Sequence, residues 1–548
     1  MISKAFVGAL VLATGCYSGA HGGGAASADS TASGGTGGTG NSTEGDSDNP
    51  PAEPGERIDV RVWRLSPTQF RNEVEAMFGA ELPDGTIPAG ATDHGISNIA
   101  ANDAIDAGNV SVLDDVTRQF ASWAVDNAPT ASRCDASFGT PECVDTFLAW
   151  FVPQAYRRAA TEDDLANMRA LFDANEAEHG YDWAFGSTVR AGLLSPDFLY
   201  RSEVGPPGES GKITLTDFEI AAALSFSMTE RGPDAELFQA ASEGLLGDPD
   251  ERERHVRRLM STSAPLWQRI FREWLGMTRI GAAAEGAGVP PELVTQMEEE
   301  YARFVEEVAV KQRGSLRDLF TASYTWAGPE LAEVYGVSHP GGGIARVELD
   351  SDERAGIFTQ PAWLVSTATS RDDYVVRRGM GIFRDAFCNE IAPPPGLDVE
   401  EANAEITPPD ATVREMVEIR GSHATCGGCH AVPDPIGLAF ELYDNSGAVR
   451  AQYATGNPIE TDVEVPGIGQ VQNGADLARA LVDDERFQAC FARRFAQVFV
   501  GQDLGDPEDM VWTRESFEAF LAADTSFEEF LVAFVRHDAF IERNKGGE

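Results

Sequence analysis

Apolar residues recur at spacings of three and four along most of the chain, which is the pattern of helices with one buried face. Cap residues precede several of these runs, at Ser66, Thr161, Thr216 and Ser526. Alternating patterns are few, and the one over residues 459–465 predicts a small hairpin. The sequence therefore predicts an all-α fold with a few short strands. The clearest core stripes are Phe487, Cys490, Phe491, Phe495, Val498 and Phe499, then Phe517, Phe520, Leu521, Phe527, Phe530, Leu531 and Phe534.

Clusters of proline and glycine interrupt the helical pattern at residues 205–208, 339–343 and 393–396, and they suggest domain boundaries. Before residue 58 the helical pattern is absent. We expect a signal peptide, a tether and then a series of mainly helical segments. The expected segments are 1–16, 17–57, 58–130, 131–208, 209–345, 346–455 and 456–548.

The N-terminus has the features of an export signal. Lys4 is followed by an apolar run over residues 5–13 and then by Cys16, an order that resembles a bacterial lipoprotein signal; an ordinary secretory signal is the alternative. Residues 17–57 contain no Val, Ile, Leu, Met, Phe or Trp, so they predict a flexible tether with a reach of roughly 35 Å. We therefore expect an exported protein of the cell envelope, lipidated at Cys16 and placed in the outer membrane.

Charge and composition exclude some partners. The chain has 88 acidic residues against 42 lysines and arginines, a formal charge of −46, and such a surface repels nucleic acid. No run of 18 apolar residues occurs, so a lipid anchor is the only membrane attachment that we expect. The run Glu298–Glu300 is interpreted as a solvated helix face. The GxSxG, HExxH, GxGxxG and P-loop signatures are absent, so catalytic residues stay unknown.

The strongest chemical signal is the motif Cys426-Gly-Gly-Cys429-His430. Two cysteines three residues apart can bond covalently to one haem, and the next histidine can bind its iron as the proximal ligand. Gly427 and Gly428 are expected to leave space for the porphyrin edge. Export of the chain agrees with this hypothesis. A CxxC can also form a plain or redox disulfide, or contribute to a zinc site, although zinc needs two further ligands.

Other short stretches support a resemblance to a known group of proteins. The chain resembles multi-domain exported proteins of planctomycetes and myxobacteria, which carry serial domains of unknown function around a cytochrome-c-like segment. The resemblance runs from about residue 60 to 543 and implies that residues 346–455 are the cytochrome-c-like part. The stretches are Arg64-Leu-Ser-Pro-Thr-Gln-Phe70, Ala155-Tyr-Arg-Arg158, Leu194-Ser-Pro-Asp-Phe-Leu-Tyr-Arg201, Leu331-Ala-Glu-Val-Tyr-Gly336, Arg354-Ala-Gly-Ile-Phe-Thr-Gln360, Arg377-Arg-Gly379, Asp434-Pro-Ile-Gly437, Glu441-Leu-Tyr-Asp444 and Phe540-Ile-Glu-Arg543.

Four cysteines remain once Cys16 is assigned to lipid and the motif to haem. In an oxidising compartment they form an even set with three possible pairings. Cys134 and Cys143 are close in sequence, so we expect them to pair, which leaves Cys388 to pair with Cys490. Buried free thiols are the alternative for the second pair.

The sixth iron ligand is left open by the sequence. Met510 and His537 follow the motif and are the candidates on the chain, and an open or water-bound iron is the third possibility. Asp434, Asp444 and Gly447 are expected to form turns beside the haem.

The function that we predict is one-electron transfer by a single covalent haem c, with an unknown redox partner. A surface binding or scaffold protein with a CxxC disulfide is one alternative, and a haem-dependent oxidase or peroxidase is another.

Overall fold

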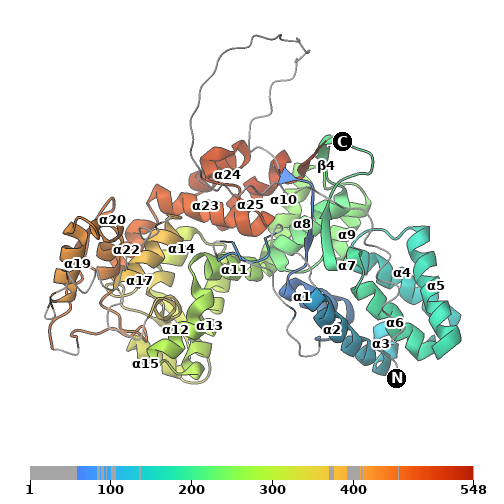
Figure 1. The fold of residues 1–548 in the computed structure, drawn as a ribbon, viewed down its shortest axis with the longest axis horizontal. Coiled ribbons are helices and arrows are strands. Elements are labelled where there is room, and N and C mark those ends of the chain that lie inside the picture. Colours follow the sequence, from blue (N-terminus) through green and yellow to red (C-terminus); the bar gives the residue numbers. More distant parts are fainter. Residues whose placement is uncertain are drawn as a thin grey trace, which may run out of the picture. The chain divides into compact units, whose positions relative to one another are not determined.

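A computed structural model describes residues 58–82, 87, 92–93, 95–99, 107–134, 137–368, 375–389, 391, 406, 408, 411–453 and 456–546. The predicted signal peptide and tether, with Cys16, lie outside these residues. The described residues are mainly helical with a few short strands, so the predicted fold class is confirmed (Figure 1). No helix in this part of the chain is long and apolar enough to cross a membrane.

The first helices surround an aromatic core of their own. Phe78 packs edge-on against Phe120, and Phe147 stacks on Phe151 with 5.0 Å between the ring centroids. The disulfide between Cys134 and Cys143 joins the end of α3 to α4, as we expect from the sequence. The helices are α1 (Pro67–Phe78), α2 (Ala107–Asp126), α3 (Ala128–Ser132), α4 (Pro141–Tyr156), α5 (Glu162–His179), α6 (Tyr181–Leu193) and α7 (Pro196–Leu199).

A larger core follows, and segments that the sequence separates into three domains share it. Leu224, Phe358 and Phe491 come from the segments 209–345, 346–455 and 456–548, and all three are fully buried in this core. Its main helices are α8 (Asp217–Thr229), α9 (Ala235–Ser242), α10 (Pro249–Leu259), α11 (Ala264–Trp274), α12 (Ile280–Ala287), α13 (Pro291–Val305), α14 (Leu316–Thr321), α15 (Pro329–Tyr335), α16 (Pro361–Ser366), α22 (Gly474–Leu481), α23 (Glu485–Val500), α24 (Val511–Ala522) and α25 (Phe527–Arg536).

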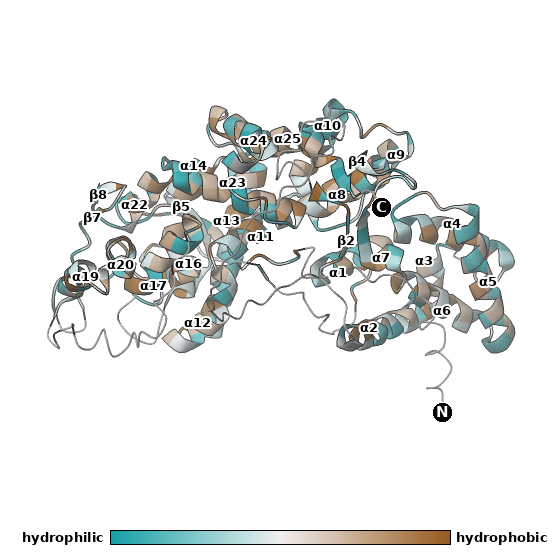
Figure 2. Cartoon of the chain, turned by 45° about the horizontal axis from the view of Figure 1, so that its top comes forward, coloured by the Kyte–Doolittle hydropathy of each residue, from teal (hydrophilic) through white to brown (hydrophobic). Residues whose placement is uncertain are grey.

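The helices begin where cap residues and patterning predict. Ser66, Thr161, Thr216 and Ser526 each accept a hydrogen bond from the backbone N–H of the residue three positions later, so these predicted helix starts are confirmed. Figure 2 shows hydrophobic and hydrophilic residues together on most helices, as expected for helices with one buried side.

Two predictions about single side chains are wrong. Leu521 is 38% exposed, because the buried face of α24 passes through Ser516 and Phe520, and the residue after Phe520 is turned about 100° away from it. Glu300 is fully buried instead of solvated. Its carboxylate accepts hydrogen bonds from the hydroxyls of Thr325, at 2.7 Å, and Tyr335.

The strands are short and pair distant segments. A three-stranded sheet places the first strand parallel to the last, with Ile58 opposite Arg543. The predicted hairpin lies partly elsewhere, because only residues 463–465 of the alternating run form a strand, and their partner follows them. The pairs are β1 (Ile58–Asp59) and β4 (Gly211–Thr214) with β9 (Glu542–Lys545), β2 (Arg61–Arg64) with β3 (Tyr200–Glu203), β5 (Tyr324–Ala327) with β6 (Ala345–Glu348), and β7 (Val463–Val465) with β8 (Gly469–Val471).

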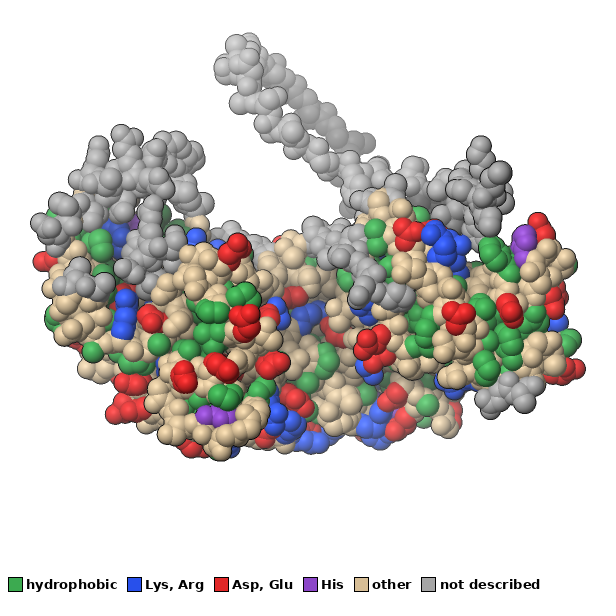
Figure 3. Space-filling view, turned by 90° about the horizontal axis from the view of Figure 1, so that it is seen from below, with side chains coloured by type: hydrophobic (Ala, Val, Ile, Leu, Met, Phe, Trp, Pro, Cys, Tyr) green, Lys and Arg blue, Asp and Glu red, His purple; other side chains and the backbone are tan. Residues whose placement is uncertain are grey.

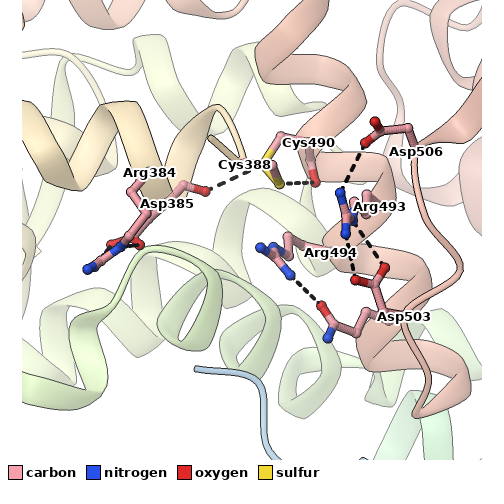
Figure 4. Close-up of a disulfide and its surroundings, with 9 residues drawn as sticks. Arg384, Asp385, Cys388, Cys490, Arg493, Arg494, Asp503 and Asp506 are labelled. Atoms are coloured by element: carbon pink, nitrogen blue, oxygen red, sulfur yellow. Dashed lines mark hydrogen bonds and ion pairs between the residues drawn. A yellow bond between two sulfur atoms is a disulfide. The ribbon is translucent and has the colours of Figure 1, made fainter. Parts of the chain in front are cut away.

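A second disulfide joins Cys388 to Cys490, as we expect from the sequence (Figure 4). Cys388 follows η8 (Gly381–Ala386), and Cys490 lies in α23. Near it on α23, Arg493 forms ion pairs with Asp503 at 2.6 Å and Asp506 at 3.2 Å. The disulfide therefore fixes the chain upstream of the CxxCH motif to a core helix.

Acidic side chains are spread over the face of the molecule that Figure 3 displays, among basic and hydrophobic ones. On this face the acidic side chains are therefore not gathered in one patch.

Candidate functional site

The CxxCH motif forms a short helical turn between two other helices. The N–H groups of Cys429 and His430 both donate to the carbonyl oxygen of Cys426 at 3.0 Å. Because residues three apart are neighbours on a helix surface, the turn places the two cysteines on one side. The helices are α19 (Val413–Ser422), α20 (Gly427–His430) and α21 (Pro433–Leu438).

Cys426 and Cys429 are free thiols, and both are partly exposed. The other four cysteines among the described residues form the two disulfides. The two cysteines of the motif are thus without a disulfide, as the haem hypothesis requires. Among the described residues, no group of three or more His, Cys, Asp or Glu side chains is placed to hold a metal ion.

His430 is held by a buried carboxylate. Its Nδ1 lies 3.0 Å from Oδ1 of Asp434, and Oδ2 of Asp434 accepts a hydrogen bond from Nε of Arg420 at 2.7 Å. The Asp434 side chain is fully buried and that of Arg420 is 4% exposed, whereas that of His430 is 21% exposed. Since a carboxylate can only accept, Nδ1 carries the proton, and Nε2 is left free to act as a ligand.

Asp434 is the residue whose role the sequence prediction missed. We expect a turn-forming aspartate from the sequence, but its carboxylate bridges Arg420 and His430. The spacing of His430 and Asp434, four residues apart, was the available signal, because such pairs meet on a helix. Asp444 does form a turn, since its Oδ1 accepts the N–H groups of Ser446 and Ala448.

Gly427 and Gly428 have different surroundings. A Cβ on Gly427 would lie 2.6 Å from the carbonyl oxygen of Gly421, so this glycine allows α19 and α20 to approach each other. The structure therefore gives Gly427 a role in helix packing that the sequence does not predict. A Cβ on Gly428 would meet nothing within 4 Å, so that position faces open space.

The site is supported by α17 (Val375–Met380), which packs closely on α21. A Cβ on Gly379 would collide with the backbone of Pro433, and one on Gly437 with the backbone of Val375. Arg378 is buried, and it donates to the carbonyl oxygens of Phe440 at 2.8 Å and Tyr443 at 2.7 Å. These backbone contacts position the chain that follows α21.

A groove of about 440 Å³ lies beside the motif. Gly421 and Ala431, on either side of the motif, line it, and the apolar side chains of Val417, Leu438 and Val463 contribute to its wall. Arg414, Glu418, Asp462 and Glu464 supply charged groups. The wall of the groove therefore combines apolar and charged side chains in similar measure.

The two candidate sixth ligands lie in other parts of the fold. Met510 is 4% exposed in the larger core, directly before α24. His537 follows α25, and its Nδ1 accepts the N–H of Ala539 at 3.0 Å. Figures 1 and 2 both show α24 and α25 apart from α20. The structure therefore does not bring Met510 or His537 to His430.

Three parts of the chain match models of protein families. Residues 143–203 match PSD5, a protein of unknown function (DUF1595), and residues 215–337 match PSD4, a protein of unknown function (DUF1592). Residues 354–453, which include the CxxCH motif, match PSCyt3, a protein of unknown function (DUF1588). The chain is a multi-domain protein with serial domains of unknown function. No curated protein and no solved structure matches it.

Proposed function

We propose that this protein is an exported, lipid-anchored carrier of one covalently bound haem c that transfers single electrons. Cys426 and Cys429 would hold the porphyrin, and His430 would bind the iron from one side. A haem bound in this way exchanges one electron between its ferric and ferrous states. The redox partner is a protein or small molecule of unknown identity.

The observation that carries the proposal is that the CxxCH motif has two free thiols and a histidine whose Nε2 is available. Its two thiols are free and partly exposed on one turn, and the Nε2 of His430 is available because Asp434 occupies Nδ1. Gly428 faces open space, and a groove lined by both apolar and charged residues lies beside the motif. The residues present therefore fit a covalent haem. The family model that covers the motif bears the name PSCyt3, and this name supports a cytochrome-like segment at residues 354–453.

The test is the optical spectrum and intact mass of the full chain, exported in a host with the haem c attachment machinery. We expect a haem spectrum that survives acid extraction, and a mass that exceeds the polypeptide mass by one haem. The Cys426→Ser, Cys429→Ser double variant should lose both signals. The Cys134→Ser, Cys143→Ser variant is the matched control and should keep them. A colourless wild-type protein with a Cys426–Cys429 disulfide would support the scaffold alternative instead.

The location of the anchor is tested separately. Cys16→Ser should move the protein from the membrane fraction to the soluble fraction, and wild-type protein that is soluble and carries no lipid by mass spectrometry contradicts this part of the proposal.

A second candidate is a haem-dependent oxidase or peroxidase. The observation that favours it is the distance of Met510 and His537 from the motif, because these are the side chains that the sequence offers as sixth ligands. Iron without a sixth protein ligand can bind a small molecule. Rapid binding of carbon monoxide to the reduced protein, unchanged in Met510→Ala and His537→Ala, favours this candidate over the electron carrier.

A further inference from the structure

A buried ion pair between Arg420 and Asp434 lies next to the motif. Arg420 comes from α19 and Asp434 from α21. Nε of Arg420 lies 2.7 Å from Oδ2 of Asp434, and Nδ1 of His430 lies 3.0 Å from Oδ1 of the same carboxylate. Fully burying a carboxylate is unfavourable unless it is paired and hydrogen-bonded. Here both of its oxygens have partners.

We propose that Asp434, held by Arg420, is a positioning residue that sets the tautomer and the electron density of the His430 imidazole, and thereby keeps the iron at a low reduction potential. This inference rests on the proposed function. A carboxylate that accepts a hydrogen bond from Nδ1 makes the imidazole a stronger donor at Nε2. A stronger donor favours the ferric over the ferrous ion, so the potential falls.

Arg420 determines where the carboxylate points. Its guanidinium occupies Oδ2 and leaves Oδ1 to His430, so each oxygen has one partner. Arg420 itself is fixed on α19, which is capped by Thr412 and packs against α20 through Gly421 and Gly427. The geometry is thus determined by helix packing before any cofactor binds.

The first experiment needs no haem. The full chain is exported in a host without the attachment machinery, labelled with ¹⁵N-histidine, and its imidazole signals are recorded by NMR. The His430→Gln variant identifies the signal of His430. We expect a protonated, hydrogen-bonded Nδ1 in the wild type, and a shifted signal in Asp434→Asn. An unprotonated Nδ1 beside a protonated Nε2 overturns the proposal, whether or not the protein ever binds haem.

The second experiment measures the reduction potential of the haem-loaded protein. Asp434→Asn keeps an acceptor oxygen but removes the charge, and we expect it to lower the preference for ferric iron by about tenfold, which raises the potential by about 59 mV. The control is Glu441→Gln, because Glu441 is another fully buried carboxylate of the same segment and is paired at 3.0 Å with Arg450 instead of a histidine. An equal shift in the two variants overturns the proposal.

Since Asp434→Asn leaves Arg420 without its charged partner, this variant can fold poorly. The Arg420→Gln, Asp434→Asn double variant removes both charges and leaves a neutral hydrogen-bonding pair. We expect it to show the same rise in potential. A wild-type potential in a folded double variant contradicts the role of Asp434. If the wild type binds no haem, the proposed function fails, and the NMR experiment still decides the orientation of His430.

Discussion

The larger core and the CxxCH region are stabilised in different ways. In the core, Phe491 lies between aromatic rings from other helices, with centroids 5.8 Å away at Phe271 and 5.3 Å away at Phe520. Beside the motif, the buried apolar side chains form a small cluster of Val375, Val417 and Leu438. Ion pairs, side-chain hydrogen bonds to carbonyl oxygens and close backbone contacts make up most of the remaining packing there.

This difference indicates which parts of the molecule tolerate substitution and which do not. Apolar packing tolerates exchange between side chains of similar volume, whereas a buried polar pair or a backbone contact depends on one residue type. We therefore expect the core to determine the overall stability and the motif region to respond to small chemical changes. Four variants are described next, from the largest expected effect to the smallest.

The first prediction concerns the disulfide that joins the two regions. Replacing Cys388 and Cys490 by serine should lower the free energy of unfolding by about 4.7 kcal/mol, because the closed loop of about 100 residues restricts the unfolded chain strongly. The Cys134→Ser, Cys143→Ser control closes a much shorter loop and should cost less than about 3 kcal/mol. Urea unfolding of the oxidised proteins measures both. Equal losses would contradict the dependence on loop length.

The second prediction concerns the aromatic core. Phe491→Ala should lower the free energy of unfolding by about 4 kcal/mol, because it removes a fully buried ring and leaves a cavity. Leu521→Ala on the neighbouring α24 is the control, and we expect a change within about 0.5 kcal/mol because that side chain is 38% exposed. Similar midpoints of denaturation for the two variants would show that the core does not dominate stability.

The third prediction concerns pH. Burial raises the pKa of Glu300 to about 7. The hydrogen bonds from Tyr335 and Thr325 lower this pKa, but their effect is smaller than that of burial. Because the folded state holds this proton more tightly than the unfolded state, the contribution of Glu300 to stability is largest below pH 4.5 and is lost as the pH rises to about 7. The loss amounts to about 3 kcal/mol. Between pH 4.5 and 7, the free energy of unfolding of Glu300→Gln should change by about 3 kcal/mol less than that of the wild type. Parallel curves of the free energy of unfolding against pH would refute the raised pKa of Glu300.

The fourth prediction compares two adjacent glycines of the motif. Gly427→Ala should destabilise the α19 and α20 contact by about 1–3 kcal/mol, because its Cβ would lie 2.6 Å from the Gly421 carbonyl oxygen. Gly428→Ala places its Cβ in open space and should have little effect on the haem-free chain. Hydrogen exchange of the α19 amides in the haem-free chain measures the difference. Unchanged protection in Gly427→Ala would show that the helices can separate without cost.

Several features of this protein were predictable because they depend on local order in the chain. The helix starts at Ser66, Thr161, Thr216 and Ser526 follow from cap residues whose partners lie three positions away. The Cys134–Cys143 disulfide follows from the short spacing of its cysteines, whereas Cys388 was paired with Cys490 by elimination. The CxxCH motif is likewise a local pattern, and its two thiols are free in the structure, as the haem hypothesis requires.

Other features were decided only by the tertiary structure. Glu300 is buried because β5 and α15 bring Thr325 and Tyr335 to it, and a run of acidic residues shows nothing of such partners. Leu521 is exposed because the packing of α24 selects one of two possible faces. The positions of Met510 and His537 relative to His430 also depend on contacts between segments far apart in the chain.

The sequence by itself therefore determined the helical class, the cap positions, the local Cys134–Cys143 pairing and the motif, since each depends on residue type and short spacing. Only the tertiary structure decided that three predicted segments share one core, that Gly427 serves helix packing, and that Asp434 faces His430 and Arg420. The physical reason is that burial and hydrogen-bond pairing are properties of neighbours in space. A side chain such as Asp434 acquires its role when α19 and α21 pack together.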